Sequence, residues 1–202
     1  SYAAEIGMQA RGVVEVAREV HEGLISAVKS QKADLMLVGY SAADTEDARA
    51  QARDRAERIF DRIMYRVARG AGIDLIVAKF RRPTVASIMV PVLKGLNLPV
   101  SGVVLRALLA ADDASVLFVR AVEPDVDVEE QQQDLNRVLA EHDLDELGDA
   151  EIVSSPDPRA ALVERANEYD MAIIGAERPT IVDAVFGNMA ERVASEASCS
   201  AL

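Results

Sequence analysis

The stretch Tyr169-Asp170-Met171-Ala172-Ile173-Ile174-Gly175 has a close counterpart earlier in the chain, Ala33-Asp34-Leu35-Met36-Leu37-Val38-Gly39. Each contains an Asp, an apolar run and a closing glycine, which is typical of a buried strand that ends in a turn. A second pair of similar segments, Phe60–Ala68 and Phe186–Ala194, follows in the same order. A strand that enters a helix through a glycine turn is the unit of a parallel α/β sheet. The repeat therefore predicts two related α/β modules in one chain.

The second module is expected to be the more complete one, because strand and helix patterns alternate along it. Such alternation predicts an open, doubly wound parallel sheet. We expect residues 1–80 to form the back half of the first module, residues 81–85 to be a linker and residues 86–202 to be the second module. Its expected strands span 87–92, 115–119, 150–153 and 171–175, with a fifth from 200, and its expected helices span 98–111, 129–141, 159–168 and a segment from 188.

The first module is expected to be incomplete. Asp34 aligns with Asp170 at an offset of 136 residues. The counterpart of the strand that opens the second module would therefore lie about 50 residues before residue 1. Because the first strands of such a sheet usually lie at its centre, we expect the chain to be the C-terminal part of a longer protein, or to lack part of the first module. Within the first module we expect a strand over 12–20, a helix over 23–32, a buried strand over 35–39 and a strand over 73–78.

One helix, over residues 98–111, has a predicted core face. The spacing of its apolar residues favours one side of the helix for packing against the sheet. We expect that side to carry Val103, Val104, Ala107 and Leu108.

The composition restricts the possible functions. Hydrophobic residues make up 50% of the 202 residues, which is enough to bury a core. The net charge of -12 argues against a nucleic-acid-binding surface. No apolar run approaches the roughly 18 residues of a membrane-spanning helix. We expect the single cysteine, Cys199, to be a small buried residue, and neither His21 nor His142 has neighbours at metal-ligand spacing.

Three motifs of the second module resemble the universal stress protein family. They are Ile88-Met89-Val90-Pro91-Val92, the Tyr-Asp-apolar strand ending at Gly175, and Val185-Phe186-Gly187-Asn188 at the start of the last long helix. The resemblance implies a five-stranded parallel sheet of order 3-2-1-4-5, which in that family often binds ATP. An acidic residue after the first strand, a Gly-x-x-Gly and a later Gly-Ser/Thr at a helix N-terminus would contact the nucleotide.

The second module departs from the family pattern at each of these contacts. After the first strand comes Leu93-Lys94-Gly95, with no acidic residue. An arginine stands at the second glycine position, and an asparagine replaces the hydroxyl residue. Weak binding of ATP or AMP remains open, because this arginine can pair with phosphate and this asparagine can donate a hydrogen bond. The degenerate site that the resemblance implies consists of Val92, Gly175, Arg178, Gly187 and Asn188.

The first module departs further from the pattern. Gly39 is kept, but Asp61 and Arg62 occupy the positions that would cradle phosphate. A carboxylate at that helix N-terminus repels phosphate, so we expect the first module to bind no nucleotide.

A finer resemblance concerns the biological role. Residues 10–25, running into residues 34–40, are similar to the stress-protein module at the cytoplasmic C-terminus of amino-acid permeases and related secondary transporters. This implies a non-enzymatic regulatory or sensing domain on the cytoplasmic side, tethered by an upstream transmembrane part. The alternative is a stand-alone tandem stress protein that binds ATP or AMP. A hydrolase of the related nucleotide group is disfavoured, because the sequence offers no Ser-His-Asp set, Cys-His pair or facing carboxylates.

The family resemblance also suggests an assembly. In that family the last strands of two modules pair with each other, and an exposed strand edge favours such pairing. We therefore expect the strand formed by Ile73, Leu75, Ile76 and Val77 to face the strand that starts at Ser200, within one chain or between two chains.

Overall fold

The computed structural model describes residues 11–39, 66–67, 70–79, 84–92, 98–111, 113–175 and 196–202. The chain divides into two compact units. Unit 1 comprises Ser1–Val38 with Ala42–Ile76, and unit 2 comprises Gly39–Ser41 with Val77–Leu202. Each unit is described by itself below.

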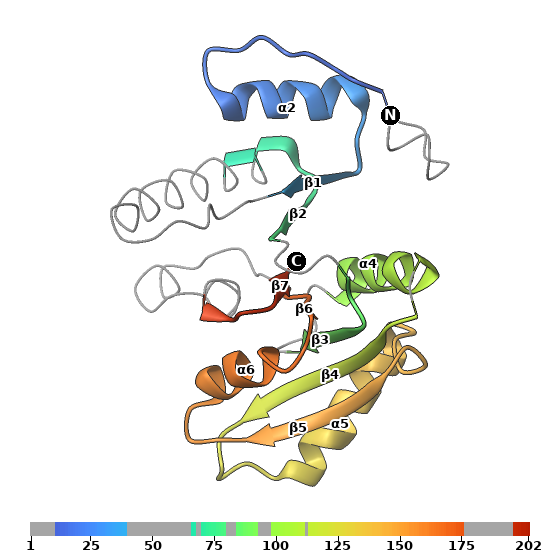
Figure 1. Cartoon of the computed structure of the whole chain (residues 1–202), viewed down its shortest axis with the longest axis vertical. Helices are drawn as coiled ribbons and strands as arrows, with labels where there is room; N and C mark the ends of the chain where they lie inside the picture. Colours follow the sequence, from blue (N-terminus) through green and yellow to red (C-terminus); the bar gives the residue numbers. More distant parts are fainter. Residues whose placement is uncertain are drawn as a thin grey trace. The chain divides into compact units, whose positions relative to one another are not determined.

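Unit 2 contains a five-stranded sheet whose named strand pairs are all parallel (Figure 1). The strand order is β5-β4-β3-β6-β7, so the first strand of the module lies at the centre and the third and fifth lie at the edges. This confirms the predicted order of 3-2-1-4-5. The strands are β3 (Ser87–Pro91), β4 (Ser115–Val122), β5 (Asp149–Ser154), β6 (Met171–Ala172) and β7 (Ser200–Ala201).

Helices cover both faces of this sheet, as a doubly wound fold requires. One core cluster packs α4 (Leu98–Ala111) and α5 (Val128–Glu141) against alternate residues of β3, namely Ile88 and Val90. The other core cluster packs α6 (Pro158–Ala166) against the intervening residue Met89. Successive side chains of a strand point to opposite faces, so the central strand is buried on both sides.

Aspartates define where two of these helices begin. Asp127 precedes α5 and accepts hydrogen bonds from the backbone nitrogens of Glu129 and Glu130 at 2.9 and 3.1 Å. Asp157 caps α6 in the same way, and Pro158 follows at the first helical position. These caps satisfy backbone N–H groups that have no partner inside the helix.

The helix α4 has the predicted bounds, but the predicted core face is wrong in part. Val103 is 61% exposed, Ala107 is exposed, and Val104 and Leu108 are only partly buried. The buried positions are Leu98, Ser101, Gly102 and Leu105. Apolar residues surround this helix on nearly every side, so periodicity does not select one face. Close packing at small residues selects the buried side instead. A Cβ at Gly102 would lie 2.9 Å from Leu144 Cδ2, which is closer than an ordinary contact, so the helix approaches Leu144 through a residue without a side chain.

Unit 1 contains α2 (Val20–Gln31) and two paired strands, β1 (Leu35–Gly39) and β2 (Asp74–Ala78), whose last residues pass into unit 2. The predicted strand over 12–20 is wrong, because residues 11–17 have no regular structure and α2 starts at Val20. Glu15 instead accepts hydrogen bonds from the hydroxyls of Ser26 and Ser30 on α2, at 3.5 and 3.4 Å. A strand needs a neighbour for its backbone groups, and alternating valines do not supply one.

The strand β1 is less buried than predicted. Leu35 is 41% exposed and Leu37 is 63% exposed, whereas Met36 and Val38 are half-buried. One face of β1 is therefore covered and the other is open.

None of the helices in the described ranges is both long and apolar enough to cross a membrane.

Candidate functional site

The candidate site of unit 2 lies at the carboxyl edge of its sheet, between β3 and β6. The chain order reverses there, since β4 flanks β3 on one side and β6 on the other. In open α/β sheets, ligands bind outside the carboxyl ends of the strands at such a switch point. The printed partners of β3 and β6 are Ile88 with Met171 and Met89 with Ala172. Val92 and Gly175, two of the residues that the sequence singled out, follow the carboxyl ends of these two neighbouring strands.

Val92 supplies only apolar surface to this edge. Its side chain is buried, and its backbone nitrogen donates to Val119 O at 2.8 Å. Its carbonyl oxygen accepts from Arg120 Nε at 3.4 Å. Both backbone groups are therefore engaged within the sheet, and the position carries no charge that could orient a ligand.

Gly175 follows β6 at a strand end that is fixed on both sides. The nitrogen of Ile173 donates to Met89 O at 2.9 Å, and the nitrogen of Ile174 donates to Leu202 O at 2.7 Å. The glycine is half-buried, and a glycine has no side chain that would keep a ligand from its backbone. The other predicted site residues, Arg178, Gly187 and Asn188, lie outside the described residues, as do Leu93-Lys94-Gly95, Asp61 and Arg62.

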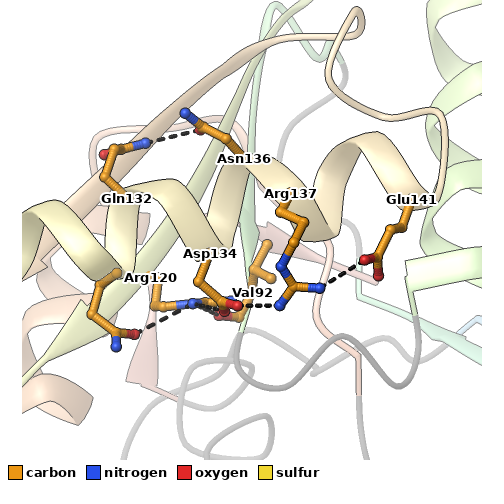
Figure 2. A network of polar contacts seen from close by, with 8 residues as sticks. Val92, Arg120, Gln132, Asp134, Asn136, Arg137 and Glu141 are labelled. Atoms are coloured by element: carbon orange, nitrogen blue, oxygen red, sulfur yellow. Dashed lines mark hydrogen bonds and ion pairs between the residues drawn. The ribbon is translucent and has the colours of Figure 1, made fainter.

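Sequence reasoning missed Arg120, a buried arginine at the same edge (Figure 2). It lies on β4, one strand from the switch point, and its Nη1 is 2.7 Å from Asp134 Oδ2 on α5. The same Nη1 is 3.4 Å from Gln131 Oε1. The sequence does contain a signal for this residue, since it is the single charge within the apolar run Val116–Val122. A charge in a buried strand requires a paired partner, so such a position predicts an ion pair.

Asp134 joins this arginine to the surface of α5. Its other carboxylate oxygen pairs with Arg137, which in turn pairs with Glu141 at 2.7 Å (Figure 2). Hydrogen bonds from Arg120 and then from Arg137 lower the pKa of the Asp134 carboxyl below its ordinary value of 3.8. The carboxylate therefore stays ionised near neutral pH, and its oxygens are bound to guanidinium groups. It is a poor candidate for a general acid or base.

Other candidate groups are structural. Cys199 is buried in the core cluster beneath α6, as expected. Over the described ranges, no three His, Cys, Asp or Glu side chains are grouped so as to hold a metal ion.

Most of the predicted pairing strand belongs to β2. Leu75, Ile76 and Val77 belong to β2, whose neighbour is β1, and Ile73 immediately precedes it. Just beyond β2, Lys79 and Ala201 of unit 2 form an antiparallel bridge. Lys79 N donates to Ala201 O at 2.7 Å, and Ala201 N donates to Lys79 O at 2.9 Å. The pairing of whole strands stays a prediction.

Solved structures with similar folds come from bacteria and archaea. A protein of unknown function from Pseudomonas aeruginosa PAO1 has a TM-score of 0.60 and 16% identity, over 99% of this chain and 73% of that chain. A universal stress protein from Archaeoglobus fulgidus DSM 4304 has a TM-score of 0.54 and 11% identity, over 89% of this chain and 63% of that chain. These likenesses concern the fold alone.

A universal stress protein solved in complex with cAMP has 22% identity over 58% of this chain and 94% of that chain. Its TM-score of 0.44 is too low for that complex to bear on ligand binding here. Curated proteins give no match to the chain. The universal stress protein family matches residues 96–202, more than half of the chain. The chain therefore belongs to the universal stress protein family.

Proposed function

We propose that the chain is a non-enzymatic regulatory module of the universal stress protein type. The observation that carries the proposal is the sequence Leu93-Lys94-Gly95, which follows the buried Val92 and begins with an apolar residue where the family pattern has an acidic one. An apolar residue there removes a contact that would orient a nucleotide.

The charged groups described at this edge also favour a non-catalytic role. Arg120 and Asp134 are paired with each other, and the lowered pKa of Asp134 makes proton transfer near neutral pH unfavourable. A regulatory module needs a change of conformation or partner and does not need a reacting group.

The finer proposal is that the module is the cytoplasmic C-terminal domain of an amino-acid permease-type transporter. It is supported by the resemblance of residues 10–25 and 34–40 to such modules. An antiserum against the chain would test it on fractionated native cells. A band much larger than 21.8 kDa in the membrane pellet is the expected result. A band of modest size in the soluble fraction, and none in the membrane pellet, would contradict the transporter proposal.

A second candidate function is nucleotide binding by a stand-alone tandem protein. The observation that favours it is Gly175, a half-buried glycine that follows β6 at the switch point and has no side chain to keep a ligand from its backbone. ATP or AMP is the ligand class that the family resemblance suggests.

Calorimetric titration with ATP and AMP, together with an assay for released phosphate, separates the two functions. The regulatory proposal expects no phosphate release and no saturable heat. Saturable binding that is abolished in Gly175→Val would establish the second candidate. The control Gly12→Val changes a glycine in unit 1 with open space around its Cβ position.

We also propose that the two modules associate through their last strands. The Lys79–Ala201 bridge supports this, because it shows that the outer side of β7 can accept an antiparallel neighbour.

A further inference from the structure

The buried arginine at the carboxyl edge of the unit 2 sheet has hydrogen-bond donors that the described fold leaves unused. The side chain of Arg120 is 9% exposed, and its guanidinium group reaches from β4 to the residue that follows β3. Nε donates to Val92 O at 3.4 Å, and Nη1 donates to Asp134 Oδ2 at 2.7 Å and to Gln131 Oε1 at 3.4 Å (Figure 2). Within the described ranges, Nη2 has no hydrogen-bond partner. Water or a ligand must therefore supply an acceptor for its two N–H groups.

A second donor group lies beside the guanidinium group. The half-buried side chain of Gln131 on α5 accepts from Arg120 Nη1 through Oε1. Its Nε2 is bonded to the same carbon as that oxygen, so these N–H groups also lie near the guanidinium group. The described part of the chain provides no acceptor for this Nε2. The two side chains thus offer donors only, and a ligand that fits them must present acceptor oxygens.

The charge of this site selects among such ligands. Asp134 lies 2.7 Å from Arg120 Nη1, so the pair carries no net charge, and the chain as a whole has a net charge of -12. A polyanion such as ATP gains little from a neutralised arginine and is repelled by the acidic chain. A monocarboxylate carries one charge on two acceptor oxygens, and its hydrogen bonds to a guanidinium group are stronger than those of a neutral carbonyl.

The surroundings restrict the size of the ligand. Val92 follows β3 and Val122 ends β4, and these residues are 1% and 9% exposed. Val122 shares a sheet face with Arg120, because the two residues are two positions apart in one strand. Their burial leaves little open surface around the guanidinium group, so the ligand must be small, with at most a short hydrocarbon part.

We propose that Arg120 and Gln131 bind the carboxylate of a small monocarboxylate at the carboxyl edge of the unit 2 sheet, while Asp134 holds the guanidinium group in place. Arg120 Nη2 and Gln131 Nε2 donate to the carboxylate oxygens, and no covalent bond forms or breaks. The inference gives the proposed regulatory module a ligand class, and it rests on that function only for the role of the ligand as a signal.

Nuclear magnetic resonance of the ¹⁵N-labelled 202-residue chain tests this binding. Sodium acetate is titrated near neutral pH against sodium chloride at the same ionic strength. We expect saturable shifts of the Arg120 Nε–H signal and of the Gln131 side-chain amide signals, half complete at about 1–10 mM acetate. Sodium chloride should give no saturable shift, because it changes only the screening of charges.

Two variants locate the site, with the Gln131 side-chain amide as the common signal. Arg120→Met removes the guanidinium group and should weaken acetate binding by at least about tenfold. If this variant fails to fold because Asp134 is left unpaired, the double variant Arg120→Met with Asp134→Leu removes both charges and serves in its place. The matched control Arg137→Met removes a guanidinium group that pairs with the same carboxylate from a 60% exposed side chain, and it should leave acetate binding unchanged.

Three results would overturn the inference. No saturable shift with acetate in the folded chain would mean that water alone satisfies these donors. Equal losses in Arg137→Met and Arg120→Met would place the anion on the exposed surface of α5. Tighter binding of ATP than of acetate at the same signals would assign the site to a nucleotide and support the second candidate function. The assay for released phosphate tests the regulatory function separately, so either proposal can fail without the other.

Discussion

At the scale of single residues, Asp170 connects two strands that are far apart in the sequence. Its carboxylate accepts three hydrogen bonds from Ala86 and Ser87, and its own backbone nitrogen lies 3.1 Å from Ser87 Oγ. A half-buried carboxylate that satisfies two backbone N–H groups is expensive to remove, because those donors lose their partner.

Asp170→Ala should therefore lower the free energy of unfolding by about 2–3 kcal/mol. Urea denaturation followed by circular dichroism measures the change. The control Asp145→Ala removes an exposed carboxylate from the same unit and should change the stability by less than about 0.5 kcal/mol. Equal effects of the two substitutions would refute the assigned role of Asp170.

The Arg120–Asp134 pair makes a pH-dependent contribution. The pKa of Asp134 is lowered in the folded protein, so its stabilisation is present above the ordinary value of 3.8 and is lost as the pH falls through the folded pKa. Asp134→Asn should destabilise the protein by a constant amount between about pH 5 and pH 8, and by less below about pH 4. Chemical denaturation across this range measures the difference, and a difference that grows at low pH would contradict the assignment.

At the scale of elements, α4 shows which part of a helix governs stability. Leu105 is fully buried against β3, whereas Val103 on the same helix is 61% exposed. Leu105→Ala should cost about 2–4 kcal/mol through lost burial and a cavity, and Val103→Ala less than about 0.5 kcal/mol. Thermal unfolding of both variants compares the two positions directly. A larger loss for Val103→Ala would restore the face that periodicity predicted.

The same helix marks the limit of prediction from sequence. The expected helices over 129–141 and 159–168 begin within one residue of α5 and α6, because a helix start depends on local groups: the caps Asp127 and Asp157 act on residues two and three positions away. The buried side of α4 depends on which neighbour reaches it, and Leu144 is far from Gly102 in the sequence. The pairing of Arg120 with Asp134 depends on how α5 lies on β4. The valines at 14 and 16 match the strand period, but the described structure gives them no neighbouring strand.

At the scale of the whole molecule, the outer edge of the unit 2 sheet is the surface through which we propose that the modules associate. On the side of β7 that faces β6, Ser200 N donates to Asp170 O, and Leu202 N, just after the strand, donates to Ala172 O. On the opposite side, Ala201 N donates to Lys79 O. Alternate amides of an outer strand thus serve different neighbours. Ala201→Pro removes only the donor that faces Lys79, because proline has no N–H.

Ala201→Pro should therefore expose the Lys79 amide to exchange by about tenfold or more while the amides of β4 stay protected. If association through this edge joins two chains, the same substitution should also shift the protein to a smaller sedimentation coefficient. The control is Ala201→Gly, which changes the same residue but keeps its backbone N–H donor. Unchanged exchange at Lys79 in Ala201→Pro, with folding intact, would show that the bridge does not hold the edge and would leave the proposed association of the modules without its structural support.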